Sequence, residues 1–190
     1  GKASGDVVIP STVTSMSEGV FAYNTKITSV TITSVTEIPY QAFISCTKLT
    51  TVDIQDSVTS IEKAAFYGCV SLNELNLSDP IASIGDFAFY GCESLETLDF
   101  SELTTLTSIG YSAFQKCTAL TSVVFNQQFT DVGVASFAYC TSLTRISFCS
   151  SLGQQSFEEA STKTINLGSG AFGGCKKLAT VNYYSTNAKI

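Results

Sequence analysis

Cysteine is the residue type in this chain whose number and spacing suggest chemistry. The chain has seven cysteines and no histidine. Six of the cysteines follow a phenylalanine by three positions: Cys46, Cys69, Cys92, Cys117, Cys140 and Cys175. Cysteines in such numbers can form disulfides, bind metal or act as nucleophiles. The absence of histidine already excludes Ser–His and Cys–His nucleophile pairs and every histidine metal site.

The phenylalanine that precedes each of these cysteines marks a repeat. The phenylalanines are Phe21, Phe43, Phe66, Phe89, Phe114, Phe137 and Phe172, so that most intervals are 22 to 25 residues. In every copy, the positions six, nine and eleven residues after phenylalanine are apolar or aromatic. One copy of about 23 residues cannot bury so many apolar side chains alone, so neighbouring copies must stack and share one core. The repeat therefore predicts a solenoid.

The apolar pattern within each copy predicts β-structure. Residues 72–77, Leu-Asn-Glu-Leu-Asn-Leu, alternate as a half-buried strand does. The Val-x-x-Ile segment before each phenylalanine predicts either a second short strand or an extended stretch. No segment has a sustained helical period, so we expect little regular helix. The last interval is longer than the others, and we expect either a degenerate coil or a surface loop at residues 149–166.

The six cysteines of the repeat are expected inside the stack. A column in stacked strands recurs about every 4.8 Å with its side chains parallel, an orientation that does not favour disulfides. Stacked repeats also lack the paired, short-spaced ligands of zinc sites. We therefore expect a ladder of buried free thiols that make weak hydrogen bonds, with no metal and no cofactor. Asn24 replaces cysteine in the first copy, and the register of Cys149 places it on the outer face of the strands.

The side chains between the core positions of each strand must point outward, because successive residues face opposite sides. They are expected to form one continuous face of mostly small polar residues, suited to a protein partner. The predicted ligand-binding face consists of Thr51, Asp53, Glu74, Asn76, Thr97, Asp99, Ser122, Val124, Arg145 and Ser147. The alternative is a face that is only solvated.

Charge is distributed unevenly along the chain. Residues 51–102 hold ten acids and one base, Lys63, in a chain whose net charge is −6. Asp53, Glu74 and Asp99 are expected on neighbouring coils of the outward face, where they would attract a basic partner. The acidic composition argues against nucleic acid as a partner. No acid lies beside a pocket-forming insertion, so we identify no catalytic residue and expect no enzyme activity.

The pattern Leu-x-x-Val-x-Ile followed by Val-Thr-x-Ile-x-x-x-Ala-Phe-x-x-Cys resembles the BspA-like leucine-rich repeat family of bacterial and protist surface proteins. Residues 58–69 match it closely, while Val20, Asn24 and Ser136 depart from it. The resemblance implies a single leucine-rich-repeat solenoid over residues 1–190, with seven recognisable coils and a parallel sheet on one face. It also implies a cell-surface or secreted protein that binds an extracellular protein, such as a host matrix or plasma protein, and has no enzyme activity.

Two other functions remain open. Tyr67 and Tyr90 occupy the same turn position on adjacent coils and would offer rings to a sugar in a carbohydrate-binding module, unless they are a structural aromatic pair. A passive spacer is the other alternative. The apolar runs are too short to cross a bilayer, so we expect no membrane insertion, and we expect a monomer. Residues 7–10 either cap the stack or continue from preceding chain, and the polar tail after Tyr184 suggests a fragment of a longer protein.

Overall fold

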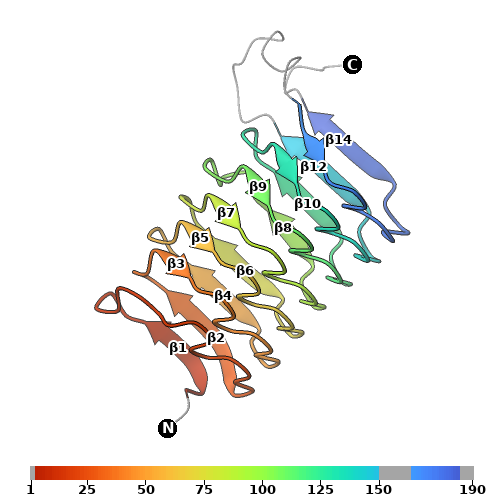
Figure 1. Ribbon diagram of the computed structural model, residues 1–190. Coiled ribbons are helices and arrows are strands. Elements are labelled where there is room, and N and C mark those ends of the chain that lie inside the picture. Colours follow the sequence, from red (N-terminus) through yellow and green to blue (C-terminus); the bar gives the residue numbers. More distant parts are fainter. Residues whose placement is uncertain (1–2, 150–163, 185–190) are drawn as a thin grey trace.

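The computed structural model describes residues 3–149 and 164–184, which form a solenoid of stacked coils (Figure 1). These residues contain strands and turns but no helix, and so no helix that could cross a membrane. The longer strands are β1 (Gly5–Ile9), β2 (Ile27–Ile32), β4 (Thr51–Ile54), β6 (Glu74–Leu77), β8 (Thr97–Asp99), β10 (Ser122–Phe125), β12 (Arg145–Cys149) and β14 (Thr180–Tyr184). The two-residue strands are β3 (Glu37–Ile38), β5 (Ser60–Ile61), β7 (Ser83–Ile84), β9 (Ser108–Ile109), β11 (Asp131–Val132) and β13 (Asn166–Leu167).

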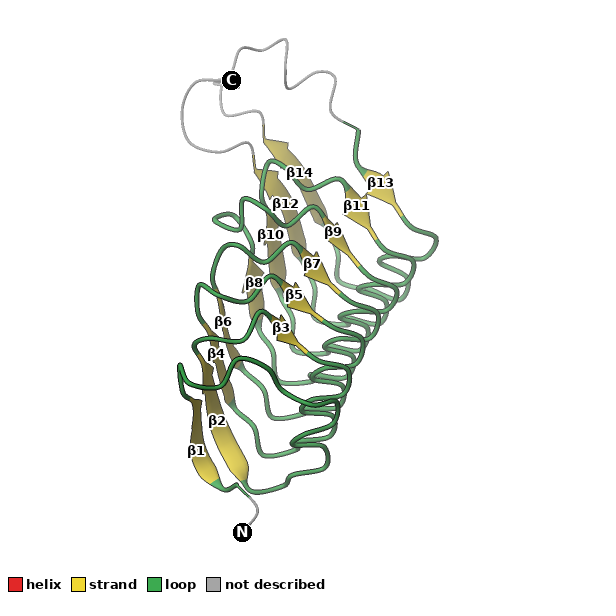
Figure 2. Ribbon diagram, turned by 60° about the vertical axis from the view of Figure 1, so that its left-hand side comes forward, coloured by secondary structure: helices red, strands yellow, loops and turns green. Residues whose placement is uncertain are grey.

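The two sets of strands lie on different sides of the coils (Figure 2). The longer strands form parallel sheets on one side, and the short strands form a six-stranded sheet in the order β13-β11-β9-β7-β5-β3. The leucine-rich-repeat solenoid with a parallel sheet on one face is therefore confirmed. The Val-x-x-Ile segments end in a second short strand in every copy except the first. The segment predicted as a degenerate coil or loop falls largely on residues 150–163, outside the described residues. After it, β13 pairs with β11 in the sheet of short strands.

The longer strands do not form one continuous sheet. They form two four-stranded sheets, β1-β2-β4-β6 and β14-β12-β10-β8, so β6 and β8 are not paired. Leu75 and Leu77 of β6 are only half-buried, whereas Val52 and Ile54 at the same positions of β4 are fully buried. The expectation of one unbroken face is wrong at this point.

The break coincides with a change in loop length. In the coil of β8, Leu106 follows Phe100 by six positions, whereas in the coil of β6, Ile81 follows the equivalent Leu77 by four. There the two coils are joined through a side chain, because the Asp79 carboxylate accepts hydrogen bonds from Thr104 Oγ1 at 2.7 Å and Thr105 Oγ1 at 3.0 Å. These hydrogen bonds lower the pKa of Asp79, and the bond from Thr104 contributes most.

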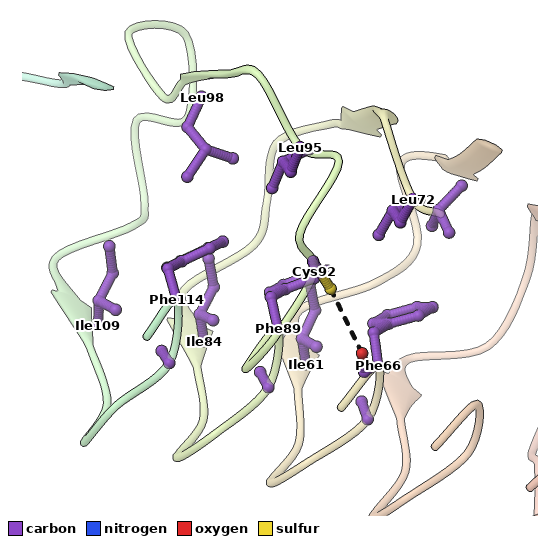
Figure 3. Close-up of a cluster of buried hydrophobic side chains, with 14 of the residues drawn as sticks. Ile61, Phe66, Leu72, Ile84, Phe89, Cys92, Leu95, Leu98, Ile109 and Phe114 are labelled. Carbon is purple, nitrogen blue, oxygen red and sulfur yellow. Dashed lines mark hydrogen bonds between the residues drawn. The ribbon is translucent and has the colours of Figure 1, made fainter. Parts of the chain in front are cut away.

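The phenylalanines form one continuous stack inside the solenoid, and Figure 3 shows Phe66, Phe89 and Phe114 of this stack. Successive rings lie 5.0 to 5.5 Å apart between centroids and are nearly parallel. Phe43, Phe66, Phe89, Phe114 and Phe137 are completely buried. Isoleucines of the short strands and leucines that follow each cysteine pack around this stack, as the apolar columns predict.

Each turn around a phenylalanine is bent at two left-handed residues. The residues two before and two after each phenylalanine all have φ between 52° and 77°. They are Gly19, Tyr23, Gln41, Ser45, Ala64, Gly68, Phe87, Gly91, Ser112, Lys116, Ala135, Tyr139, Gly170 and Gly174. This conformation aims three N–H groups of one turn at the next, as in Ala64 N to Asp86 O at 2.9 Å and Gly68 N to Tyr90 O at 2.8 Å. Because only five of the fourteen residues are glycine, residue type alone does not predict this geometry.

Candidate binding surface

Strands β4 and β6 present the first part of the predicted ligand-binding face. Thr51 lies opposite Glu74, and Asp53 lies opposite Asn76. Thr51 Oγ1 donates to Glu74 Oε2 at 3.2 Å, a contact that holds the carboxylate across the two strands. Glu74 and Asn76 are exposed, while Thr51 and Asp53 are partly exposed. These four side chains form a polar surface that is open to a partner.

Strands β8, β10 and β12 carry the second part of this face. Thr97, Ser122 and Arg145 form one row across the three strands, and Asp99 and Val124 begin the next row. Thr97, Asp99 and Arg145 are exposed, and Ser122 and Val124 are partly exposed.

Ser147, which ends the second row, corrects the sequence prediction. The serine has the expected outward register, but only 6 % of its surface is accessible. Its short side chain stands between Val124 of β10 and Asn182 of β14, the two strands that pair with β12. Register alone did not reveal that so small a side chain would be covered, and we exclude Ser147 from the face.

The three acids of the face are divided by the break in the sheet. Asp53 and Glu74 lie diagonally on the paired strands β4 and β6, whereas Asp99 lies on β8, beyond the unpaired edge of β6. Asp99 Oδ1 accepts the Ser101 N–H at 2.9 Å. No group of three metal-ligating side chains that could hold an ion occurs within the described parts of the chain.

The six cysteines of the repeat form the expected ladder. Each thiol donates to the carbonyl oxygen of the phenylalanine one coil earlier, at 3.1 to 3.4 Å, as Cys92 does to Phe66 (Figure 3). All six are free thiols, and five of them are buried. Burial raises the pKa of Cys46 to about 11 and raises that of Cys69 and Cys92 further, so these thiols are poor nucleophiles. The side chain of Cys149 lies outside the described residues.

Asn24 makes the corresponding contacts in the first coil. Its side chain amide donates to Ala3 O at 2.9 Å, and its side chain oxygen accepts the Lys26 N–H at 2.9 Å. The position therefore needs a donor to backbone oxygen rather than a reactive group, which agrees with the prediction that the cysteines have a structural role.

Tyr67 and Tyr90 are stacked on each other at the turn edge of the solenoid. Their centroids are 4.7 Å apart and their planes differ by 3°. Lys116 Nζ lies 5.3 Å from the centre of the Tyr90 ring. A hydrogen bond to Tyr90 raises the pKa of Lys116. The facing sides of the two rings are occupied by each other, which favours the structural aromatic pair over a platform for a sugar.

Stacked coils of about 23 residues, with parallel strands on one face and leucine-type columns inside, define a leucine-rich repeat solenoid. The chain matches the BspA type leucine rich repeat region in six copies, over residues 3–71 and 36–164, and belongs to that family. Leucine-rich repeat families are generally non-catalytic, and the match assigns no enzyme activity.

Two solved structures show the same fold. A leucine-rich repeat protein of T. pallidum is 26% identical, with a TM-score of 0.78 over 92% of this chain and 78% of that one. A leucine-rich repeat protein of Bacteroides ovatus is 27% identical, with a TM-score of 0.68 over 75% of this chain and 37% of that one. No match was found among curated protein sequences.

Proposed function

We propose that this solenoid is an adhesin-like module that binds an extracellular protein on the outward face of its longer strands. The observation that carries the proposal is the arrangement of this face. Its rows of short side chains are held in register by parallel strands, whereas the apolar columns between them are turned into the core. A rigid surface of this kind loses little conformational entropy on binding. Membership of the family suggests that this protein lies at the cell surface or is secreted.

The charge of the face suggests a partner with a basic surface. Asp53, Glu74 and Asp99 belong to the segment with ten acids and one base. Glu74 and Asp99 are exposed, and Asp53 is partly exposed. Exposed charges of one sign mainly speed association and set its salt dependence. Matrix and plasma proteins, which the family resemblance names, are the first partners to test.

The test is surface plasmon resonance of the chain against immobilised fibronectin and fibrinogen. The variant D53N/E74Q/D99N removes three charges from the face with little change in shape. The matched control E18Q/E37Q/E93Q removes three charges from exposed residues outside the face. We expect the first variant to bind at least about tenfold more weakly at low salt, with a smaller salt dependence, and the control to bind nearly as the parent does.

Three outcomes contradict this proposal. If D53N/E74Q/D99N binds as tightly as the parent protein, the acidic face is excluded as the site. If this variant and the control are weakened equally, only the net charge of the protein matters. Binding to none of a panel of matrix and plasma proteins would favour the passive spacer.

A further inference from the structure

A hollow of about 360 Å³ lies at the turn edge of the solenoid, and none of its lining residues belongs to a strand. Ala64 forms part of its wall, between Gln41 of the preceding coil and Phe87 of the following one. The three residues occupy the same left-handed position of successive turns. The hollow exists because the middle side chain of the three is a single methyl group.

The side chains around the hollow combine ring surfaces with hydrogen-bonding groups. Tyr40, Tyr67 and Phe87 contribute aromatic rings, and Gln41 and Lys63 contribute an amide and an ammonium group. Tyr40 is 39% exposed, so its ring is open to a ligand. A pyranose ring has the matching character, with a face of C–H groups that stacks on an aromatic ring and hydroxyl groups at its edge. The volume is near the lower end for small-molecule sites, which suits one or two sugar residues.

The backbone around the hollow does not suit an extended peptide. Gln41 N donates to Lys63 O at 3.2 Å, and Ala64 N donates to Asp86 O at 2.9 Å, so these groups are used within the stack of turns. Recognition here must come from side-chain groups and ring faces. Peptides that add to a sheet depend instead on free backbone groups at a strand edge.

The charges in and beside the hollow limit the class of sugar that it would bind. Lys63 is the only charged residue in the lining, and the exposed acids Glu62 and Asp86 adjoin Lys63 and Phe87 in the chain. The two carboxylates offset the one ammonium group, so the site offers an acidic sugar no net attraction, and a neutral sugar suits it better. We propose that the hollow over Ala64 binds a neutral pyranose residue of a glycan. This site is separate from the strand face, and it does not depend on the protein partner proposed for that face.

The test is saturation-transfer difference NMR with methyl β-glucopyranoside, methyl β-galactopyranoside, methyl α-mannopyranoside and N-acetylglucosamine. A methyl glucuronide and a proline-rich peptide serve as competing ligand classes. We expect saturation transfer to at least one neutral sugar, with a Kd of about 1 mM. A64L fills the hollow and should abolish the transfer. A135L places the same side chain in the same left-handed position of a distant coil and should leave the transfer unchanged.

Y40A provides a second variant in case A64L does not fold, which thermal unfolding will show. It removes an exposed ring, and we expect binding to weaken about fivefold to tenfold through lost stacking. The proposal is overturned if no neutral sugar receives saturation. It is also overturned if A64L or Y40A binds as the parent does, or if the glucuronide or the peptide binds more tightly than every neutral sugar.

Discussion

The thiol of each ladder cysteine joins one coil to the coil before it. Cys69 donates to Phe43 O at 3.2 Å, and Cys140 donates to Phe114 O at 3.2 Å. The S–H group is a weak donor, but it satisfies a carbonyl oxygen that is buried under the next turn. The phenylalanine of the same turn supplies most of the apolar contact. Cysteine is therefore used here for its size and its single proton, and not for its reactivity.

Phe66 provides the stability test at this scale. Its ring is completely buried and stacks at 5.1 Å on both Phe43 and Phe89, so Phe66→Ala leaves a cavity between two coils. We expect a loss of about 3 to 5 kcal/mol in the free energy of unfolding, measured by urea denaturation. Tyr40→Ala, which truncates an exposed ring, is the control and should cost much less. If Phe66→Ala lowers the free energy of unfolding no more than Tyr40→Ala does, the phenylalanine stack does not stabilise the core.

Two kinds of glycine occur in the turns around the phenylalanines. Gly91 has φ of 71° and ample space, since an added Cβ would meet nothing nearer than Gly68 Cα at 4.0 Å. Gly133 has no such φ, but an added Cβ would clash with Ile109 O of the preceding coil. The first glycine provides a backbone conformation, and the second allows close stacking. Glu62 occupies the position equivalent to Gly133 in an earlier coil, so the close approach is a property of the later coils.

These two glycines should respond differently to alanine. Gly91→Ala adds only the left-handed conformational strain, and we expect a loss of about 1 kcal/mol in the free energy of unfolding. Gly133→Ala must instead push two coils apart, and we expect a loss of about 2 to 3 kcal/mol. Chemical denaturation of both variants measures the difference. Equal losses would show that the coils can separate locally without cost.

At the scale of the whole molecule, stability is a sum over coils and the junctions between them. The junction of β6 with β8 lacks strand pairing, while the short-strand sheet and the phenylalanine stack continue across it. The thiol ladder also continues across this point, since Cys92 donates to Phe66 O and Cys117 donates to Phe89 O. The interior therefore holds together a molecule whose outer face is divided.

The ladder makes the molecule sensitive to alkaline pH. Burial raises the folded-state pKa of Cys46, Cys69, Cys92 and Cys117, to about 11 for Cys46, above the value of about 8.5 for an unfolded thiol. The stabilisation is fully present below about pH 8.5 and is lost as pH rises toward the folded pKa, because only the unfolded chain ionises readily. We expect the free energy of unfolding to fall between about pH 8.5 and 11.

Cys92→Ala isolates the contribution of one thiol to this pH dependence. The variant should be less stable than the parent protein at pH 7. Its free energy of unfolding should fall less steeply with rising pH than that of the parent, the two slopes differing by up to about 1.4 kcal/mol per pH unit. Urea unfolding at pH 7, 9 and 10 under reducing conditions measures the slope. Tyrosines and lysines contribute equally to both proteins, so identical slopes would contradict the role of the thiol.

The sequence by itself determined the solenoid, the strand of each coil, the core columns and the buried cysteines. These features follow from a period repeated seven times and from alternation within six residues, which are local and redundant signals. The outward register of nearly the whole predicted face also followed from this alternation. The fourteen left-handed residues were not predictable, because nine of them are not glycine and their conformation is imposed by hydrogen bonds to the next coil.

Only the tertiary structure decided how neighbouring coils differ. The break between β6 and β8, the burial of Ser147 and the hollow over Ala64 each depend on what the adjacent coils place beside a residue. In the sequence, Ala64 is one small residue of a repeat column. In the structure it lies between Gln41 and Phe87 and forms part of the wall of the hollow. A repeat sequence specifies the coil, and the packing of unequal coils specifies the surface that a partner meets.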